Sequence, residues 1–253
     1  MGHFRSRETV ESALRMSDEG ISDRVNADIH GVALQTIRTW RRRYQLEGRT
    51  RGAGTPCPRC HGAELDEAAY ALLLGWYLGD GSIARARRGV FTLQIANDQK
   101  YPELSQEIAA TVKRVKPNAS PCLRGGSSAT RIEARWKHWP CVFPQHGPGR
   151  KHLRTIELEP WQQEIVAKYP EMLLRGLFHS DGCRFVNWAS KPDGRRYYYV
   201  RYMFSNESDD IRKILTDGLD LLGIAWRQPR RNVVAVSRQV GVAALDAFVG
   251  PKS

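Results

Sequence analysis

Two aspartates have the spacing and surroundings of a paired metal site. Asp80 and Asp181 are each the next-to-last residue in a copy of one pattern, LLGWYLGDG at 73–81 and LRGLFHSDG at 174–182, and lie 101 residues apart. The apolar stretch before each acid predicts a short helix, and a carboxylate at the C-terminal end of a helix lies near the negative end of its dipole. Two such carboxylates side by side repel each other, and a divalent cation with oxygen ligands relieves that repulsion. The pattern therefore predicts a site for Mg²⁺ or Mn²⁺.

The same pattern predicts what brings the two acids together. Gly75 and Gly176 each lie four residues before a second small residue, Gly79 and Ser180, so each pair shares one helix face. Helices without bulky side chains on the shared face can approach backbone to backbone. We therefore expect the two motif helices to pack on each other, with their terminal aspartates adjacent.

Similar elements follow each motif. An apolar strand at 91–97 precedes a helix with apolar periodicity at 101–115, and a strand at 202–206 precedes a helix at 209–222. Each copy is predicted as helix, two strands, helix, two strands, which indicates an α+β protein with an internal repeat, at about 67–160 and 161–253.

The paired motifs at this spacing resemble those of the single-chain LAGLIDADG homing endonucleases, over roughly residues 67–251. The resemblance implies a pseudo-twofold fold in which the motif helices form the interface and saddle-shaped antiparallel sheets grip double-stranded DNA. It implies that Asp80 and Asp181 hold metals that cleave both strands, with backbone carbonyls of Gly79 and Ser180 as further ligands. The alternative is two ordinary buried helices with capping acids.

Members of that family place basic or amide side chains near the attacking water. Lys151, in the sequence GPGRKH ahead of the second motif, is the first candidate for this role, and Gln94 on a strand of the first repeat is the second. Phosphate contact or solvation is the alternative for both. We expect His179, two positions before the second acid, to face the helix pair or solvent.

The charge of the chain favours a polyanionic partner. The formal net charge is +12 and the sequence pI is about 9.8, and residues 67–253 carry 28 Lys and Arg against 18 Asp and Glu. Double-stranded DNA fits this excess, and a solvated basic face is the alternative. No apolar run reaches the length of a membrane span. We expect a cytoplasmic, nucleoid-associated monomer.

Alternation in residues 129–137 predicts a strand with an apolar face and a charged face. A basic hairpin in the second repeat offers similar side chains, and a ribbon of this kind can enter the major groove. The DNA contacts predicted from these strands are Arg131, Arg135, Lys137, Arg195, Arg196 and Arg201. A sheet kept soluble by charge would look alike.

Residues 1–48 are predicted as a separate helical domain. Within it, residues 21–40 resemble a helix-turn-helix of resolvases and transposases, with Gly31 at the turn and Ala27, Val32, Ile37 and Trp40 toward the core. Its second helix offers side chains suited to base edges and phosphates: Gln35, Arg38, Arg41, Arg42 and Arg43. The alternative is a helical hairpin that packs on the main domain.

Two features depart from the helix-turn-helix pattern. Asn26 and His30 stand where apolar residues are usual, and we expect Val25 and Ile29 to supply the apolar pair one position earlier. Ala33 stands where Ser or Thr would cap the second helix.

Residues 49–66 are predicted as a linker rich in glycine and proline. The sequence CPRC at 57–60, followed by His61, has the form of half a zinc site, so that Cys57 and Cys60 are candidate ligands. Cys141 with His146 could complete the site in space. The alternative is a tight Cys-Pro turn.

Two functions remain open. Both acids are present, which favours a site-specific double-strand DNA endonuclease. The helix-turn-helix favours the alternative, a transcriptional regulator that binds DNA on a LAGLIDADG-like fold without cutting it.

Overall fold

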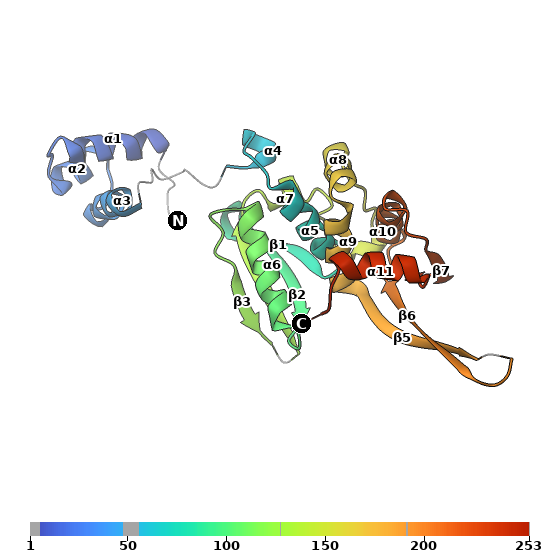
Figure 1. Cartoon of the computed structure of the whole chain (residues 1–253). Helices are drawn as coiled ribbons and strands as arrows, with labels where there is room; N and C mark the ends of the chain where they lie inside the picture. Colours follow the sequence, from blue (N-terminus) through green and yellow to red (C-terminus); the bar gives the residue numbers. More distant parts are fainter. Residues whose placement is uncertain (1–5, 48–55, 127, 191, 253) are drawn as a thin grey trace. The chain divides into compact units, whose positions relative to one another are not determined.

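The computed structural model describes residues 6–47, 56–126, 128–190 and 192–252. The chain divides into two units, Met1–Pro56 and Cys57–Ser253, shown in Figure 1. Residues 57–66, which we predicted as linker, therefore fall in the second unit. Within the described ranges, no helix is long and apolar enough to cross a membrane.

The described part of the first unit consists of three helices around a small apolar core. They are α1 (Arg7–Asp18), α2 (Asp23–Ile29) and α3 (Leu34–Glu47). Serines cap two of them, because the hydroxyls of Ser6 and Ser22 accept from the third backbone N–H that follows. Gly31, with φ of +57°, makes the turn between α2 and α3. The core consists of Val10, Ala13, Leu14, Ala27, Ile37 and Trp40, with Val32 packed against it.

The prediction that Val25 and Ile29 supply the buried apolar pair of α2 is wrong. Val25 and Ile29 are 49% and 58% exposed, whereas Asn26 is fully buried. Asn26 fits this position because its Nδ2 donates to the carbonyl of Ala13, at 2.7 Å, and to the hydroxyl of Ser17. Both partners belong to α1, a helix outside the predicted motif. These bonds satisfy the buried amide nitrogen, whereas Oδ1 of Asn26 has no hydrogen-bond partner among the described residues.

The second unit contains two copies of one element order, as predicted. The first copy comprises α5 (Glu67–Leu78), β1 (Gly81–Arg85), β2 (Phe91–Asp98), α6 (Pro102–Val115), β3 (Cys122–Gly125) and β4 (Ala129–Trp136). The second comprises α9 (Pro170–Asp181), β5 (Gly182–Ser190), β6 (Arg196–Ser205), α10 (Asp209–Leu221), β7 (Arg227–Arg230) and β8 (Val233–Val236). Further short elements are α4 (Pro58–His61), η1 (Arg87–Gly89), α7 (Trp139–Val142), η2 (Lys151–Leu153), α8 (Pro160–Lys168) and α11 (Gln239–Phe248).

The two antiparallel sheets have the same topology. Their strand orders are β1-β2-β4-β3 and β5-β6-β8-β7. The registers also correspond, since Gly81 pairs with Ile95 and Gly182 with Phe204, each glycine following its aspartate. The predicted pseudo-twofold α+β fold is confirmed. The copies differ most in the β5-β6 hairpin, which extends beyond the rest of its sheet in Figure 1.

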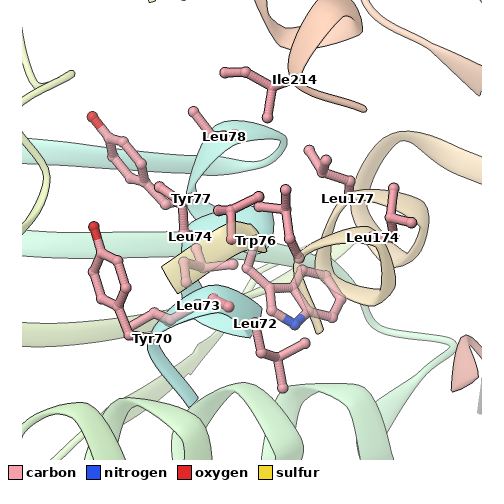
Figure 2. Close-up of a cluster of buried hydrophobic side chains, with 14 of the residues drawn as sticks. Tyr70, Leu72, Leu73, Leu74, Trp76, Tyr77, Leu78, Leu174, Leu177 and Ile214 are labelled. Carbon is pink, nitrogen blue, oxygen red and sulfur yellow. The ribbon is translucent and has the colours of Figure 1, made fainter. Parts of the chain in front are cut away.

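Helices α5 and α9 pack together at their glycines. A Cβ on Gly75 would lie 2.3 Å from the carbonyl oxygen of Leu173, and one on Gly176 would lie 2.4 Å from that of Leu72. Such distances mean that the two backbones are in contact, as the spacing of small residues predicts. The rest of α5 is apolar and buried from Ala69 to Leu78. Figure 2 shows its side chains beside Leu174 and Leu177 of α9 and Ile214 of α10.

Candidate metal centre

The two aspartates line one open cavity at the ends of the motif helices. Asp80 follows Gly79, the C-cap of α5, and Asp181 is the last residue of α9. The cavity has a volume of about 370 Å³ and is also lined by Lys151 and Asn206. A Cβ built on Gly79 would lie 3.2 Å from Oδ2 of Asp181, so this carboxylate reaches the backbone directly before Asp80. The packing of α5 on α9 thus places both carboxylates in the same cavity.

Both carboxyl groups have raised pKa values. Burial among protein atoms, then repulsion by Asp181, raises the pKa of Asp80 to about 6. Burial also raises the pKa of Asp181, opposed by a hydrogen bond of 2.7 Å from Nδ2 of Asn206 to its Oδ2. The side chain of Asp80 is nevertheless open to solvent on one side. A bound cation would offset the repulsion and hold both groups ionised.

Two lysines interact electrostatically with both aspartates. Lys151 donates to the carbonyl oxygens of Tyr77, Leu78 and Gly79, at 2.5, 2.9 and 2.7 Å, which are the free carbonyls at the end of α5. Lys252 donates to the carbonyl of Gly182 at 2.7 Å. Burial lowers the pKa of Lys151 to about 8 and also lowers that of Lys252, while both aspartates oppose these shifts.

Separate supports hold the two lysines. Arg154 donates to the carbonyls of the preceding loop, Gly147 at 2.7 Å, Pro148 and Gly149, and so shapes the segment that carries Lys151. Two side chains of α9 hold the C-terminal segment that carries Lys252. Arg175 donates to the carbonyls of Phe248 and Val249, and Nε2 of His179 bonds to the carbonyl of Val249 at 2.7 Å.

His179 has a structural position. It is 3% exposed and stacks on Trp76 of α5, with ring centroids 5.8 Å apart. Burial lowers its pKa to about 4, so the ring is neutral near pH 7. It faces the helix pair, as we expected, and fixes the C-terminal segment.

The donor atoms at the cavity suit a hard divalent cation. Carboxylate oxygens of Asp80 and Asp181 and nearby backbone carbonyls are the ligand types that Mg²⁺ and Mn²⁺ prefer. The carbonyl of Gly79 accepts from Lys151 and retains a second lone pair. The hydroxyl of Ser180 donates to the carbonyls of Gly176 and Leu177 in its own helix. The backbone carbonyl of Ser180 as a metal ligand stays a prediction.

Gln94 does not line this cavity. It lies on the outer face of β2, opposite Glu133 of β4, and its Nε2 donates to Oε1 of Glu133 at 3.2 Å. Arg124 of β3 binds the other oxygen of the same carboxylate at 2.9 Å. The structure therefore places Gln94 in a polar cluster on the sheet surface.

The predicted basic side chains of the first sheet are exposed. Arg131 and Arg135 alternate with the buried Ile132 and Ala134 along β4, and Lys137 follows the strand.

The predicted basic side chains of the second sheet have aromatic and acidic neighbours. Arg201 is half-buried, 4.9 Å above the ring of Phe185. Arg196 stacks on Trp188 at 4.3 Å, and Arg195 pairs with Asp193. Arg196 and Arg201 lie on opposite faces of β6, because side chains alternate along a strand.

The first unit presents its predicted DNA contacts on α3. Gln35, Arg38 and Arg42 are exposed, whereas Arg41 is half-buried and donates to Asp23 of α2 at 2.8 Å. Arg38 also lies 3.5 Å from Asp23. The side chain of Arg43 is outside the described residues. Arg38 and Arg41 therefore help join α2 to α3.

Sequence reasoning missed Lys252 and the role of Asn206. A signal for Lys252 was available, because Lys151 follows Asp80 and Lys252 follows Asp181 by the same 71 residues, each after a Gly-Pro step. The repeat therefore extends beyond the motifs to a lysine in each copy. Asn206 and Asn97 correspond in sequence, but the amide of Asn97 binds the carbonyl of Tyr101 instead of an aspartate.

The fold and the site define a pseudo-symmetric α+β protein with a paired-carboxylate centre between its halves. No family model matches the chain, and no curated protein matches it. Among solved structures, it is similar to the homing endonuclease I-DmoI in complex with DNA and Mn, at 12% identity over 73% of this chain and 98% of that chain, with a TM-score of 0.48.

Two further solved structures are similar. One is the LAGLIDADG meganuclease I-AabMI bound to uncleaved DNA, at 13% identity over 71% of this chain and 82% of that chain, with a TM-score of 0.46. The other is the homing endonuclease I-WcaI bound to its DNA recognition sequence, at 14% identity over 75% of this chain and 84% of that chain, with a TM-score of 0.46. What the centre can do chemically follows from its own geometry.

Proposed function

We propose that the protein is a site-specific double-strand DNA endonuclease that hydrolyses phosphodiesters with divalent metal held by Asp80 and Asp181. The observation that carries this proposal is the shared cavity, which is lined by two carboxylates with raised pKa values and by Lys151. Structural acids are ordinarily paired with cations or hydrogen-bonded at exposed caps. Here the helix packing forces two acids together at the negative ends of two helices.

The residues around the cavity have distinct tasks in this reaction. Asp80 and Asp181 would hold the metal, whose chemistry is to lower the pKa of bound water and neutralise charge on the phosphate. Lys151, whose pKa is lowered to about 8, keeps its proton below that pH and can stabilise negative charge that develops on the phosphate. Lys252 offers a second ammonium group near both aspartates. Asn206 holds the carboxylate of Asp181 in place.

The repeat supports cleavage of duplex DNA by one chain. Two copies of the sheet flank the acidic centre, and Arg131 and Arg135 are exposed on the first of them. Exposed arginines bind phosphates and pair with guanine in the major groove. Since both halves belong to one chain, a monomer supplies both strand-cleaving groups.

The test separates binding from cleavage. Duplexes bound by the full chain in Ca²⁺ are selected from a randomised library, the metal is exchanged for Mg²⁺, and new DNA ends are sequenced. We expect paired staggered cuts within one enriched motif, with Asp80→Asn binding the same motif without cutting it. Wild-type cutting by Asp80→Asn would exclude the proposed centre.

A second function, DNA-binding regulation without cleavage, is favoured by the first unit. The exposed Gln35, Arg38 and Arg42 on α3 offer donors for bases and phosphates. An enriched motif that stays uncut in Mg²⁺ and in Mn²⁺, with wild type and Asp80→Asn alike, would establish this function in place of the nuclease.

A further inference from the structure

Four metal-binding side chains meet at one point, away from the sequence motifs of the acidic pair. They are Cys57, Cys60, His138 and Cys141, and their donor atoms all lie within 4.8 Å of one another. Cys57 and Cys60 precede α5, whereas His138 and Cys141 follow β4, so residues about 80 positions apart converge here. We propose that these four side chains bind one structural Zn²⁺.

The two halves of the cluster have the same local structure. Cys57 is the N-cap of α4 and Cys60 lies in that helix, and His138 and Cys141 have the same relation to α7. Both helices are single turns with proline in their first positions. Donors three residues apart on one turn face the same side. The sequences C-x-x-C and H-x-x-C thus form two matching pairs.

The spacing of the donor atoms fits a tetrahedral ion. Zinc bonds of about 2.3 Å to sulfur and 2.0–2.1 Å to nitrogen place two sulfurs about 3.8 Å apart and a sulfur and a nitrogen about 3.6 Å apart. Sγ of Cys60 lies 3.4 Å from Sγ of Cys141, and the latter lies 3.6 Å from Nδ1 of His138. The sulfurs are too far apart for the ~2.05 Å of a disulfide.

His138, and not the neighbouring His61, is the nitrogen ligand of the cluster. His61 follows Cys60, but its Nδ1 accepts the backbone N–H of Cys57 at 2.9 Å and so stabilises the turn of α4. Its ring packs edge-on against His138, with centroids 5.2 Å apart.

The second pair of ligands therefore differs in part from the one that the sequence suggested. Cys141 does meet Cys57 and Cys60, as that suggestion required. His146, which we considered as its partner, is instead packed against Phe91, with ring centroids 5.5 Å apart.

The donor set decides the metal and its task. Three thiolates and one imidazole favour Zn²⁺ over the hard cations that suit the aspartates. Four protein ligands complete a tetrahedron and leave no position for substrate, so the ion would be structural. A single turn such as α4 or α7 has little stability by itself. The ion would join both turns and fix the start of the second unit to the end of the first sheet.

The cluster lies against the interior of the second unit. Cys57 is fully buried, and α7 is followed by the buried Phe143, whose ring lies 4.5 Å from that of Tyr77. The hydroxyl of Tyr70 donates to the carbonyl of Val142. Loss of the ion would therefore loosen packing on α5 as well as the two turns. This inference does not depend on the proposed nuclease activity.

The test measures metal in the full chain purified under reducing conditions. We expect close to one equivalent of zinc after dialysis, lost in Cys141→Ser and in His138→Asn, and retained in Cys122→Ser, which alters an exposed cysteine outside the cluster. Asp80→Asn should also retain it. Removal of zinc by a strong chelator should lower the melting temperature, and added Zn²⁺ should restore it.

A spectroscopic measurement on the wild-type chain decides the question even if the variants do not fold. Co²⁺ added to the chelated protein should give the thiolate charge-transfer and d–d bands of a tetrahedral site. Zinc-free wild type with five reactive thiols and no such bands would overturn the proposal. So would a disulfide between Cys60 and Cys141, found by peptide mapping without reductant.

Discussion

Asn206 donates a hydrogen bond of 2.7 Å to the carboxylate of Asp181, and its counterpart in the first repeat binds elsewhere. The register shows the correspondence, because Asn97 and Asn206 each lie two residues beyond the strand partner of the glycine that follows the aspartate. Asn97 instead donates to the carbonyl of Tyr101 at 2.7 Å and to the hydroxyl of Ser105 at 2.9 Å. The two halves of the acidic centre are therefore chemically unequal.

We expect Asn206→Ala to shift the pH dependence of cleavage. The hydrogen bond from Asn206 lowers the pKa of Asp181, so its loss should raise that pKa and move the acid limb of activity to higher pH. The profile is measured at limiting Mg²⁺, where protons compete with the metal. Asn97→Ala is the matched control, since it should lower stability without moving the limb. An unchanged pH profile for Asn206→Ala would mean that this residue does not affect the ionisation of Asp181 during cleavage.

Replacing either lysine should slow cleavage and spare binding. Loss of one group that stabilises charge in a transition state commonly slows a reaction by about 10²–10³-fold. We expect this range for Lys151→Met and Lys252→Met in single-turnover assays, with DNA affinity in Ca²⁺ little changed. Because the pKa of Lys151 is lowered to about 8, wild-type activity should fall as the pH rises above that value.

The control for these lysine variants is Lys113→Met, which removes one positive charge from an exposed position on α6. It should cleave at the wild-type rate, because its side chain lies outside the acidic cavity. Equal slowing in all three variants would mean that the chain responds to its total charge, and the two lysines would then have no special part in the reaction.

The sequence predicted the repeat because each repeat carries its own local signals. The motif helices, the strand and helix that follow them and the close approach at Gly75 and Gly176 all follow from apolar periodicity and small residues at fixed spacing. Those signals are local, and the pairing of the two halves then follows from one shared face. The acidic pair was therefore accessible from sequence.

Other parts of the site depend on contacts that no local pattern encodes. Lys252 reaches Gly182 because Arg175 and His179 hold the C-terminal segment on α9. Asn26 is buried because α1 supplies its partners, so the apolar pair was assigned one position too early. Gln94 lies on a strand of the first repeat as expected, but its side chain bonds to Glu133 of the neighbouring strand and does not line the cavity.

A methyl group at the helix crossing should strongly destabilise the second unit. In Gly75→Ala, the new Cβ would lie 2.3 Å from a backbone carbonyl of α9, which cannot rotate away. Overpacking ordinarily costs about 1–3 kcal/mol, and we expect about 3 kcal/mol or more here. Calorimetry measures the effect, with Gly125→Ala as control because its Cβ would meet only Gln99 at 3.8 Å. Equal melting of Gly75→Ala and wild type would contradict the close packing.

Removing the charge of Asp80 should stabilise the metal-free protein near neutral pH. The folded-state pKa of about 6 lies above the ordinary 3.8, so the folded chain binds the proton more tightly than the unfolded chain. The free energy of unfolding of the metal-free wild type therefore falls as the pH rises from about 4 to 6, and it stays lowered above pH 6. Solvent screening reduces the effect of this exposed side chain to about 1 kcal/mol, or ~2–4 °C in melting temperature.

Asp80→Asn should therefore melt higher than wild type at pH 8 in a chelator, with the difference vanishing toward pH 4. Glu164→Gln, an exposed acid on α8, should show no such pH-dependent gain. Added Mg²⁺ should raise the melting temperature of wild type and not of the variant, because the cation offsets the same repulsion that the substitution removes. A variant less stable than wild type at pH 8 without metal would mean that the carboxylate is held by partners in the folded chain, and the centre would then be a structural cap.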